Sequence, residues 1–134
     1  MRLLVPVDGS PYSDAALRFV AARSNARGPH PQIDVLNVQY PLPPRPGRAL
    51  GAEFVRAWHE SESGKVLKPA VGILKAAHLE PAWFYRVGLP GPEIAEWAEE
   101  HAVDLIVMGS RGRTGRMNVL LGSVAQAVLA ECRT

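Results

Sequence analysis

Residues 105–124 read LIVMGSRGRTGRMNVLLGSV, an apolar run followed by a glycine-rich segment and the start of a helical pattern. This order predicts a strand, a glycine loop and a helix. Glycine lets backbone N–H groups approach a ligand closely, and a helix start directs further N–H groups and the positive end of its dipole to the same place. Arg111, Arg113 and Arg116 add positive charge, and no acidic residue lies in this stretch. The stretch therefore predicts a site for an anion such as a phosphate group.

A plainer interpretation of the same stretch stays open, in which the glycines only make turns and the arginines only increase solubility. A glycine pattern alone does not decide between the two, because short glycine patterns recur by chance. The spacing Gly109-x2-Gly112-x9-Gly122-Ser123 matches neither the P-loop pattern nor the dinucleotide fingerprint.

A second motif lies at the other end of the chain, where residues 3–10 read LLVPVDGS. A continuous apolar run favours a strand buried on both faces, as in a parallel sheet covered by helices. Pro6 cannot donate a ladder hydrogen bond, so we expect it near the carboxyl end of that strand. Ser10 and Pro11 are typical of a helix N-cap and first helical residue.

The rest of the chain alternates between strand and helix patterns. Strands are expected at 33–40, 81–87 and 105–108, with 81–87 at an edge of the sheet, and helices after each strand. The four prolines and two glycines of residues 41–51 predict a surface loop before a long helix with a break near residues 62–69. The third helix is expected to open at Pro92 and to end at His101. The alternation predicts a single α/β domain, residues 1–134, with a doubly wound open parallel sheet and helices on both faces.

Together the two motifs resemble the universal stress protein family, ATP-binding type. The glycine spacing is similar to the family's nucleotide-binding signature, and residues 3–10 look like its first strand with a terminal aspartate. The resemblance covers nearly the whole chain and implies a Rossmann-like, adenine nucleotide hydrolase-like sheet of strand order 3-2-1-4-5. Strands 1 and 4 would then be neighbours, and Asp8 and Gly109 would meet where open parallel sheets bind ligands.

The resemblance implies an adenine nucleotide site, for ATP or AMP, with Mg²⁺ or Mn²⁺ as an optional companion of the phosphates. The backbone of Val38 would meet the adenine edge. Asp8 could accept a hydrogen bond from a ribose hydroxyl or hold the ion, or else it could cap the turn into the first helix. The site residues expected in full are Val7, Asp8, Ser10, Val38, Met108, Gly109, Gly112, Arg113, Gly122, Ser123 and Val124.

Three functions stay open on these residues. The best supported is an adenine-nucleotide-binding stress-response protein that senses or stores ATP or AMP and signals through a partner. The alternatives are slow ATP hydrolysis with a metal held by Asp8, and a nucleotide-free interaction module. We recognise no nucleophile elbow and no general base beside the glycine loop, which favours a binding protein over an enzyme.

The composition argues against several other classes of function. The formal net charge is +2, from 15 basic and 13 acidic residues, and does not favour nucleic acid. A lone cysteine, Cys132, is compatible with a reducing compartment. No apolar run is long enough for a membrane span, so we expect a cytoplasmic protein with no membrane partner. The four histidines show no metal-ligand spacing, and the three tryptophans are expected in the core.

The carboxyl end departs from the family pattern. Family members continue into a fifth strand that pairs with its copy in a dimer, whereas this sequence ends at Thr134. We therefore expect the fifth strand to be missing. An open edge on strand 105–108 would invite pairing, so we expect a homodimer or another strand-edge partner.

Overall fold

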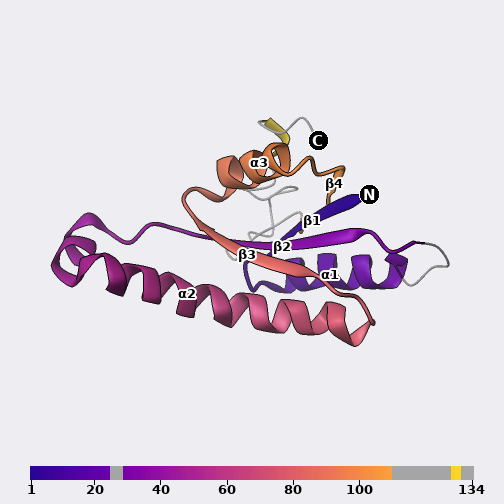
Figure 1. Ribbon diagram of the computed structural model, residues 1–134, viewed down its shortest axis with the longest axis horizontal. Coiled ribbons are helices and arrows are strands. Elements are labelled where there is room, and N and C mark those ends of the chain that lie inside the picture. The colour runs from indigo at the N-terminus through magenta and orange to yellow at the C-terminus, as the bar shows by residue number, and fades with distance from the viewer. Residues whose placement is uncertain (25–28, 110–127, 131–134) are drawn as a thin grey trace, which may run out of the picture.

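Four parallel strands and their connecting helices make up the chain in a computed structural model that describes residues 1–24, 29–109 and 128–130. The sheet order is β3-β2-β1-β4, and all three pairings are parallel (Figure 1). This confirms the doubly wound sheet and the expected neighbourhood of β1 and β4. The elements run in the order β1 (Arg2–Pro6), α1 (Pro11–Ser24), β2 (Gln32–Gln39), α2 (Pro44–Ala76), β3 (Ala82–Val87), α3 (Pro90–Glu100) and β4 (Leu105–Ile106).

Helices cover both faces of this sheet, α1 and α2 on one side and α3 on the other (Figure 1), and a hydrophobic layer lies under each set. Alternate strand residues point to opposite faces, so Val5 and Val35 pack under α1 and α2, whereas Leu4 and Leu36 pack under α3. All four of these side chains are fully buried. Each contributes roughly 1.5–3 kcal/mol relative to an exposed side chain. The apolar residues of β1 and β2 therefore serve both layers at once.

The start of α1 is as the sequence predicts. The Ser13 backbone N–H donates to Ser10 Oγ at 3.2 Å, which makes Ser10 the N-cap before Pro11. Pro6 is the last residue of β1, where its missing N–H costs no ladder hydrogen bond.

The surface loop predicted at residues 41–51 is wrong, because most of that stretch belongs to α2. The helix already begins at Pro44, where a proline in the first turn costs no hydrogen bond because that N–H has no partner within the helix. The break falls at Gly51, with φ 81° and ψ 162°, and not at residues 62–69. Glycine tolerates this positive φ, whereas Pro69 is accommodated inside the helix.

The later elements differ from expectation mainly in their bounds. β3 lies at an edge of the sheet, as predicted. α3 begins at Pro90, two residues before the predicted Pro92, and ends at the C-cap His101 as predicted. β4 is only Leu105–Ile106, and within the described chain we see no fifth strand. No helix of the described residues is both long and apolar enough to cross a membrane.

Candidate functional site

The carboxyl-terminal edge of the sheet is stepped. The ladder between β1 and β2 ends at Pro6 and Leu36, whereas β2 continues beside β3 as far as Gln39. On the other side of β1, the ladder with β4 already ends at Ile106. At about 3.3 Å per residue, β2 and β3 extend roughly 10 Å beyond the end of β1. We call the space above the end of β1, bounded by residues 37–39 of β2, the β1 step.

The backbone of Val38 faces the β1 step. Val7 N–H donates to the Leu36 carbonyl at 2.9 Å, so the backbone groups of Leu36 point toward β1. Gly88 N–H donates to the Gln39 carbonyl at 2.9 Å, so Gln39 points the other way, toward β3. Because successive residues of a parallel strand alternate sides, the N–H and C=O of Val38 point toward β1, beyond the last pair of its ladder. A donor and an acceptor therefore lie side by side at the step.

Asn37 supports this edge, and the sequence reasoning missed it. Its side chain is 2% exposed, and its Nδ2 donates to the Val7 carbonyl at 2.9 Å. Gln39 Nε2 donates in turn to Asn37 Oδ1 at 2.6 Å. These bonds tie the first residue after β1 to the projecting end of β2. The available signal was an amide residue inside the otherwise apolar run of β2.

Asp8 and Ser10 shape the turn from β1 into α1. Asp8 Oδ1 accepts a hydrogen bond from the Ser10 N–H at 2.9 Å, so one carboxylate oxygen caps the turn. The Ser10 side chain is buried and engaged as the N-cap of α1. Gly9 takes a φ of 81° between them. The turn-capping alternative for Asp8 is therefore present, and it uses one of the two carboxylate oxygens.

Gly109, which follows β4 in the chain, packs against the first turn of α1. A Cβ added to Gly109 would lie 2.8 Å from Tyr12 Cβ and 2.9 Å from the Tyr12 backbone C and O atoms. This separation is closer than a real Cβ tolerates, so packing alone already requires glycine here. Through this contact the segment after β4 lies against the first turn of α1, beside the turn that carries Asp8. The two sequence motifs meet at one end of the sheet.

Of the other expected site residues, some are described and some are not. Val7 is buried beneath α1 and α2, and Met108 packs against the layer under α3. Gly112, Arg113, Gly122, Ser123 and Val124 lie outside the described residues. Within the described ranges no group of three or more His, Cys, Asp or Glu side chains could hold a metal ion. A single carboxylate from Asp8 would suit a hydrated ion that is held mainly by phosphates.

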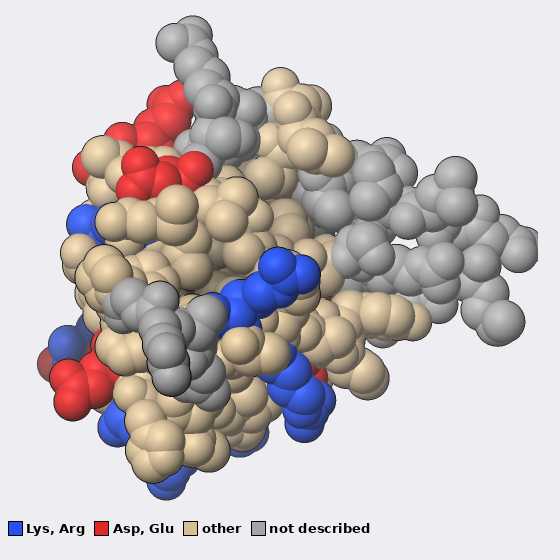
Figure 2. All heavy atoms as spheres, turned by 90° about the vertical axis from the view of Figure 1, so that its right-hand side faces the viewer, with Lys and Arg blue, Asp and Glu red and all other residues tan. Residues whose placement is uncertain are grey.

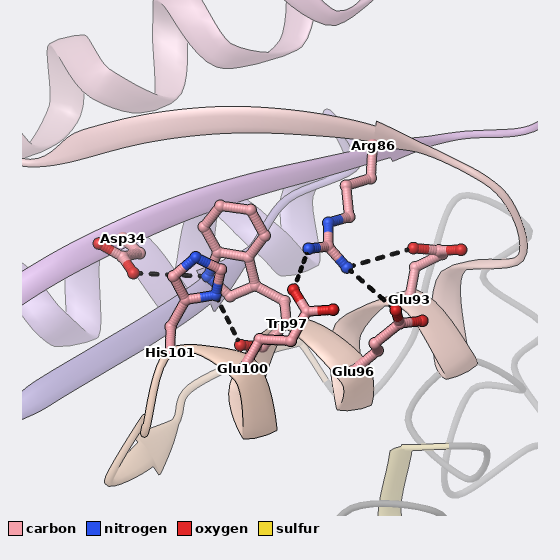
Figure 3. Close-up of polar contacts among 7 residues, drawn as sticks. All are labelled: Asp34, Arg86, Glu93, Glu96, Trp97, Glu100 and His101. Carbon is pink, nitrogen blue, oxygen red and sulfur yellow. Dashed lines mark hydrogen bonds and ion pairs between the residues drawn. The ribbon is translucent and has the colours of Figure 1, made fainter.

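A second polar cluster lies under β3 and along α3 (Figure 3). The Arg86 guanidinium lies 3.6 Å from Glu93 and 3.9 Å from Glu96, and hydrogen bonds Glu100. That hydrogen bond lowers the pKa of Glu100. The hydrogen bond and negative charge of Glu100 raise the pKa of Glu96. Arg86 also covers the Trp97 ring at 4.8 Å. One guanidinium thus serves three carboxylates of α3, and the cluster joins β3 to α3.

Comparison with known proteins gives one consistent result. The sequence model of the universal stress protein family matches residues 1–134. The chain is similar to universal stress protein MJ0531 of Methanocaldococcus jannaschii, at 33% identity over 131 residues that cover 96% of this chain and 75% of that protein.

Two solved structures resemble the fold over nearly its whole length. The structure of protein MJ0577 matches with a TM-score of 0.77 and 28% identity, covering 99% of this chain and 90% of that one. A universal stress protein from Archaeoglobus fulgidus, in complex with dAMP, matches with a TM-score of 0.69 and 26% identity, covering 100% of this chain and 93% of that one.

Proposed function

This chain belongs to the universal stress protein family, and we propose that it binds an adenine nucleotide at the β1 step. The observation that carries the proposal is the pair of Val38 backbone groups, a donor and an acceptor directed over the end of β1. Adenine presents the complementary pair on one edge, an amino donor beside a ring-nitrogen acceptor. The dAMP complex of the Archaeoglobus fulgidus relative supports this class of ligand.

In this proposal, the Val38 carbonyl accepts from the adenine amino group and the Val38 N–H donates to the neighbouring ring nitrogen. Val7, Met108 and Gly109 line the base and the ribose. The second oxygen of Asp8 accepts a hydrogen bond from a ribose hydroxyl. Several such bonds, each worth about 0.5–1.5 kcal/mol, are needed for micromolar binding.

The phosphates are assigned to the glycine-rich segment after Gly109. Backbone N–H groups around Gly112 and Gly122, with the Ser123 hydroxyl and the Arg113 guanidinium, would bind their oxygens. Ser10 and Val124 would complete the walls of the site. Asp8 would hold Mg²⁺ or Mn²⁺ only together with the phosphates.

We propose that the protein acts in the stress response as a nucleotide-responsive sensor or regulator and signals through a partner. The supporting argument is the character of the β1 step. Its described groups are backbone amides, a capping carboxylate and amide side chains, which recognise a ligand but do not form a nucleophile and base pair.

Isothermal titration of AMP, ATP and inosine monophosphate into the full chain tests the proposal. Inosine carries a carbonyl and a ring N–H where adenine carries an amino group and a bare ring nitrogen, so it places donor against donor at Val38. We expect micromolar binding of AMP or ATP and at least about tenfold weaker binding of the inosine nucleotide. Equal affinity for the two bases would contradict the assignment of Val38, and no heat with any nucleotide would contradict the function.

A glycine variant separates the phosphate loop from general effects on the fold. We expect Gly122→Val to abolish ATP binding. Gly72→Val is the matched control, because an added Cβ at Gly72 meets nothing within 4 Å. Release of ADP in the same samples would report hydrolysis. Loss of binding in both variants would show that the effect is not specific to the loop.

A further inference from the structure

The outer edge of β3 is largely apolar, and the charged groups beside it are Arg86, in the strand itself, and Lys75 of α2, which lies 5.2 Å from the centre of the Trp83 ring. Trp83 is 50% exposed, Phe84 37% and Val87 41%, and Leu89, which follows the strand, is 61% exposed. The strand AWFYRV contains no proline and no lysine, the residues that commonly block edge strands. Two tryptophans expected in the core, Trp58 and Trp83, are instead half exposed. An edge of this kind pairs readily with another strand.

Three residues of β3 direct their backbone groups away from the sheet. Gly88 N–H donates to the Gln39 carbonyl, so even-numbered residues of β3 face β2. Trp83, Tyr85 and Val87 therefore point their N–H and C=O groups outward. No hydrogen bond from elsewhere in the described residues reaches these six groups.

We propose that β3 pairs with β3 of a second copy of this chain, antiparallel, across a two-fold axis at Tyr85. In this register Tyr85 lies opposite itself, and Trp83 lies opposite Val87 of the other copy. It is the one antiparallel register in which all three outward residues pair with one another. A shift that places Trp83 opposite Tyr85 would set Val87 against Pro81, which has no N–H to donate.

The side chains on both faces of the sheet are complementary in this register. On the α2 face, the half-exposed Trp83 packs against the half-exposed Val87 of the other copy, with the two Tyr85 side chains between. On the α3 face, Phe84 lies opposite Arg86 of the other copy. The Arg86 side chain lies over the Trp97 ring and stays 22% exposed, so an approaching Phe84 meets its exposed part. The pairing thus buries apolar surface on both faces of the sheet.

The paired edge and the β1 step lie on opposite sides of β2. β3 and β4 are the two ends of the sheet order, with β2 and β1 between them (Figure 1). Two copies joined through β3 form one continuous sheet of eight described strands. The β1 step of each copy stays open, so the inference does not depend on the proposed function.

Sedimentation velocity of the full chain at micromolar concentrations tests the dimer. We expect a dimer for the wild type and for Trp58→Lys, and at least a tenfold weaker dimer for Trp83→Lys. The two variants make the same change of composition at two half-exposed tryptophans, one on α2 and one on the edge. Circular dichroism confirms that each is folded. A monomeric wild type, or a folded Trp83→Lys variant that dimerises as well as the wild type, would overturn the proposal.

A cysteine cross-link tests the register directly, in a Cys132→Ser background. Directly opposed residues of a hydrogen-bonded antiparallel pair have Cα atoms about 5.5 Å apart, within disulfide range. We expect Tyr85→Cys to form a cross-linked dimer on oxidation with copper phenanthroline. Trp83→Cys should not, because its own copy lies about 14 Å along the strand. Equal cross-linking of both variants, or cross-linking of Trp83→Cys alone, would refute the two-fold axis at Tyr85.

Discussion

The two ends of the parallel sheet treat their polar groups in opposite ways. At the amino-terminal end, the fully buried Asp34 accepts at Oδ2 from Arg2 Nε at 2.9 Å and from Trp97 Nε1 at 3.4 Å, whereas its Oδ1 has no hydrogen-bond partner among the described residues. The Arg2 N–H donates to the Asp104 carboxylate at 2.8 Å. At the carboxyl-terminal end, β2 extends beyond the end of β1, so the N–H and C=O groups of Val38 point over the β1 step.

This difference indicates where a ligand can bind. A polar group that is already paired inside the protein contributes stability, whereas an accessible unpaired group can exchange water for a ligand. Figure 2 views the molecule from the side where the strands begin and shows acidic and basic side chains together on that face. We call the amino-terminal end the closed end and the carboxyl-terminal end the open end, and we propose that the closed end serves the fold and the open end serves recognition. Four substitutions test this contrast.

The largest expected effect is at the closed end, with Trp97→Ala. Trp97 is 6% exposed, packs 4.7 Å from the Phe84 ring and stacks 3.9 Å from the His101 ring. Truncation removes this packing and a donor to Asp34, so we expect a loss of about 3–5 kcal/mol in urea unfolding. The half-exposed Trp58→Ala should cost far less. Nucleotide affinity of the folded fraction should not change, and a selective loss of affinity would contradict the division between the ends.

The ion pair of Arg2 with Asp34 gives the next effect. The Arg2 side chain is 26% exposed, whereas the Asp34 side chain is fully buried. Arg2 Nη2 lies 2.8 Å from Asp34 Oδ2. Arg2→Met leaves a buried carboxylate without its cation, and we expect a cost of about 2 kcal/mol after allowance for partial exposure. The double variant with Asp34→Asn should recover part of that loss. If the losses of unfolding free energy in the two single variants add up to the loss in the double variant, the two side chains are not coupled.

Asn37→Ala acts at the open end. The substitution removes the buried donor to the Val7 carbonyl. A buried acceptor without a partner lowers the free energy of unfolding by about 1–3 kcal/mol. We expect the low end of that range, because water can enter at the step. Unlike the first two changes, it should also weaken AMP binding in titration, because Val7 borders the β1 step. Gln39→Ala, two residues further along β2, is the milder control. Unchanged AMP affinity in a folded Asn37 variant would count against the site.

The smallest effect is expected at Glu96 on α3. The neighbouring Glu100 raises the pKa of Glu96 above its ordinary value of 4.5, so the folded state favours the protonated form. The contribution of Glu96 to the free energy of unfolding is therefore favourable in acid, and it is lost as the pH rises through the raised pKa. We therefore expect Glu96→Gln to raise the melting temperature slightly at neutral pH and to have no effect in acid. Glu99→Gln controls for the change in charge, and an equal effect of both would contradict the pairing with Glu100.

Much of the fold could be predicted because its signals are local. The unbroken apolar run of β1 indicates a strand buried on both faces, and both layers of the core confirm this. Ser10 with Pro11 marked the start of α1 because a cap depends on one side chain and its own turn. The start of α2 was missed because proline and glycine are compatible with a helix end as well as with a loop.

The meeting of the two motifs at one end of the sheet was predictable, but the construction of that end was not. The motif that ends in Asp8 and the glycine motif from Gly109 pointed to one end of the sheet, and the pairing of β1 with β4 brings them there. Asn37 was missed because its partner, the Val7 carbonyl, lies thirty residues away in the chain. Nothing local indicates that a buried amide will meet that carbonyl.

By itself, the sequence determined the order of strands and helices, the α/β class and the family, because each depends on periodicity and on motifs read along the chain. Only the tertiary structure decided that β2 outruns β1, that Gly109 must clear the backbone of Tyr12, and that Trp83 lies on an open edge. These features depend on the register between strands and on packing between segments distant in sequence. The physical reason is that a residue's neighbours across a sheet are set by the whole fold.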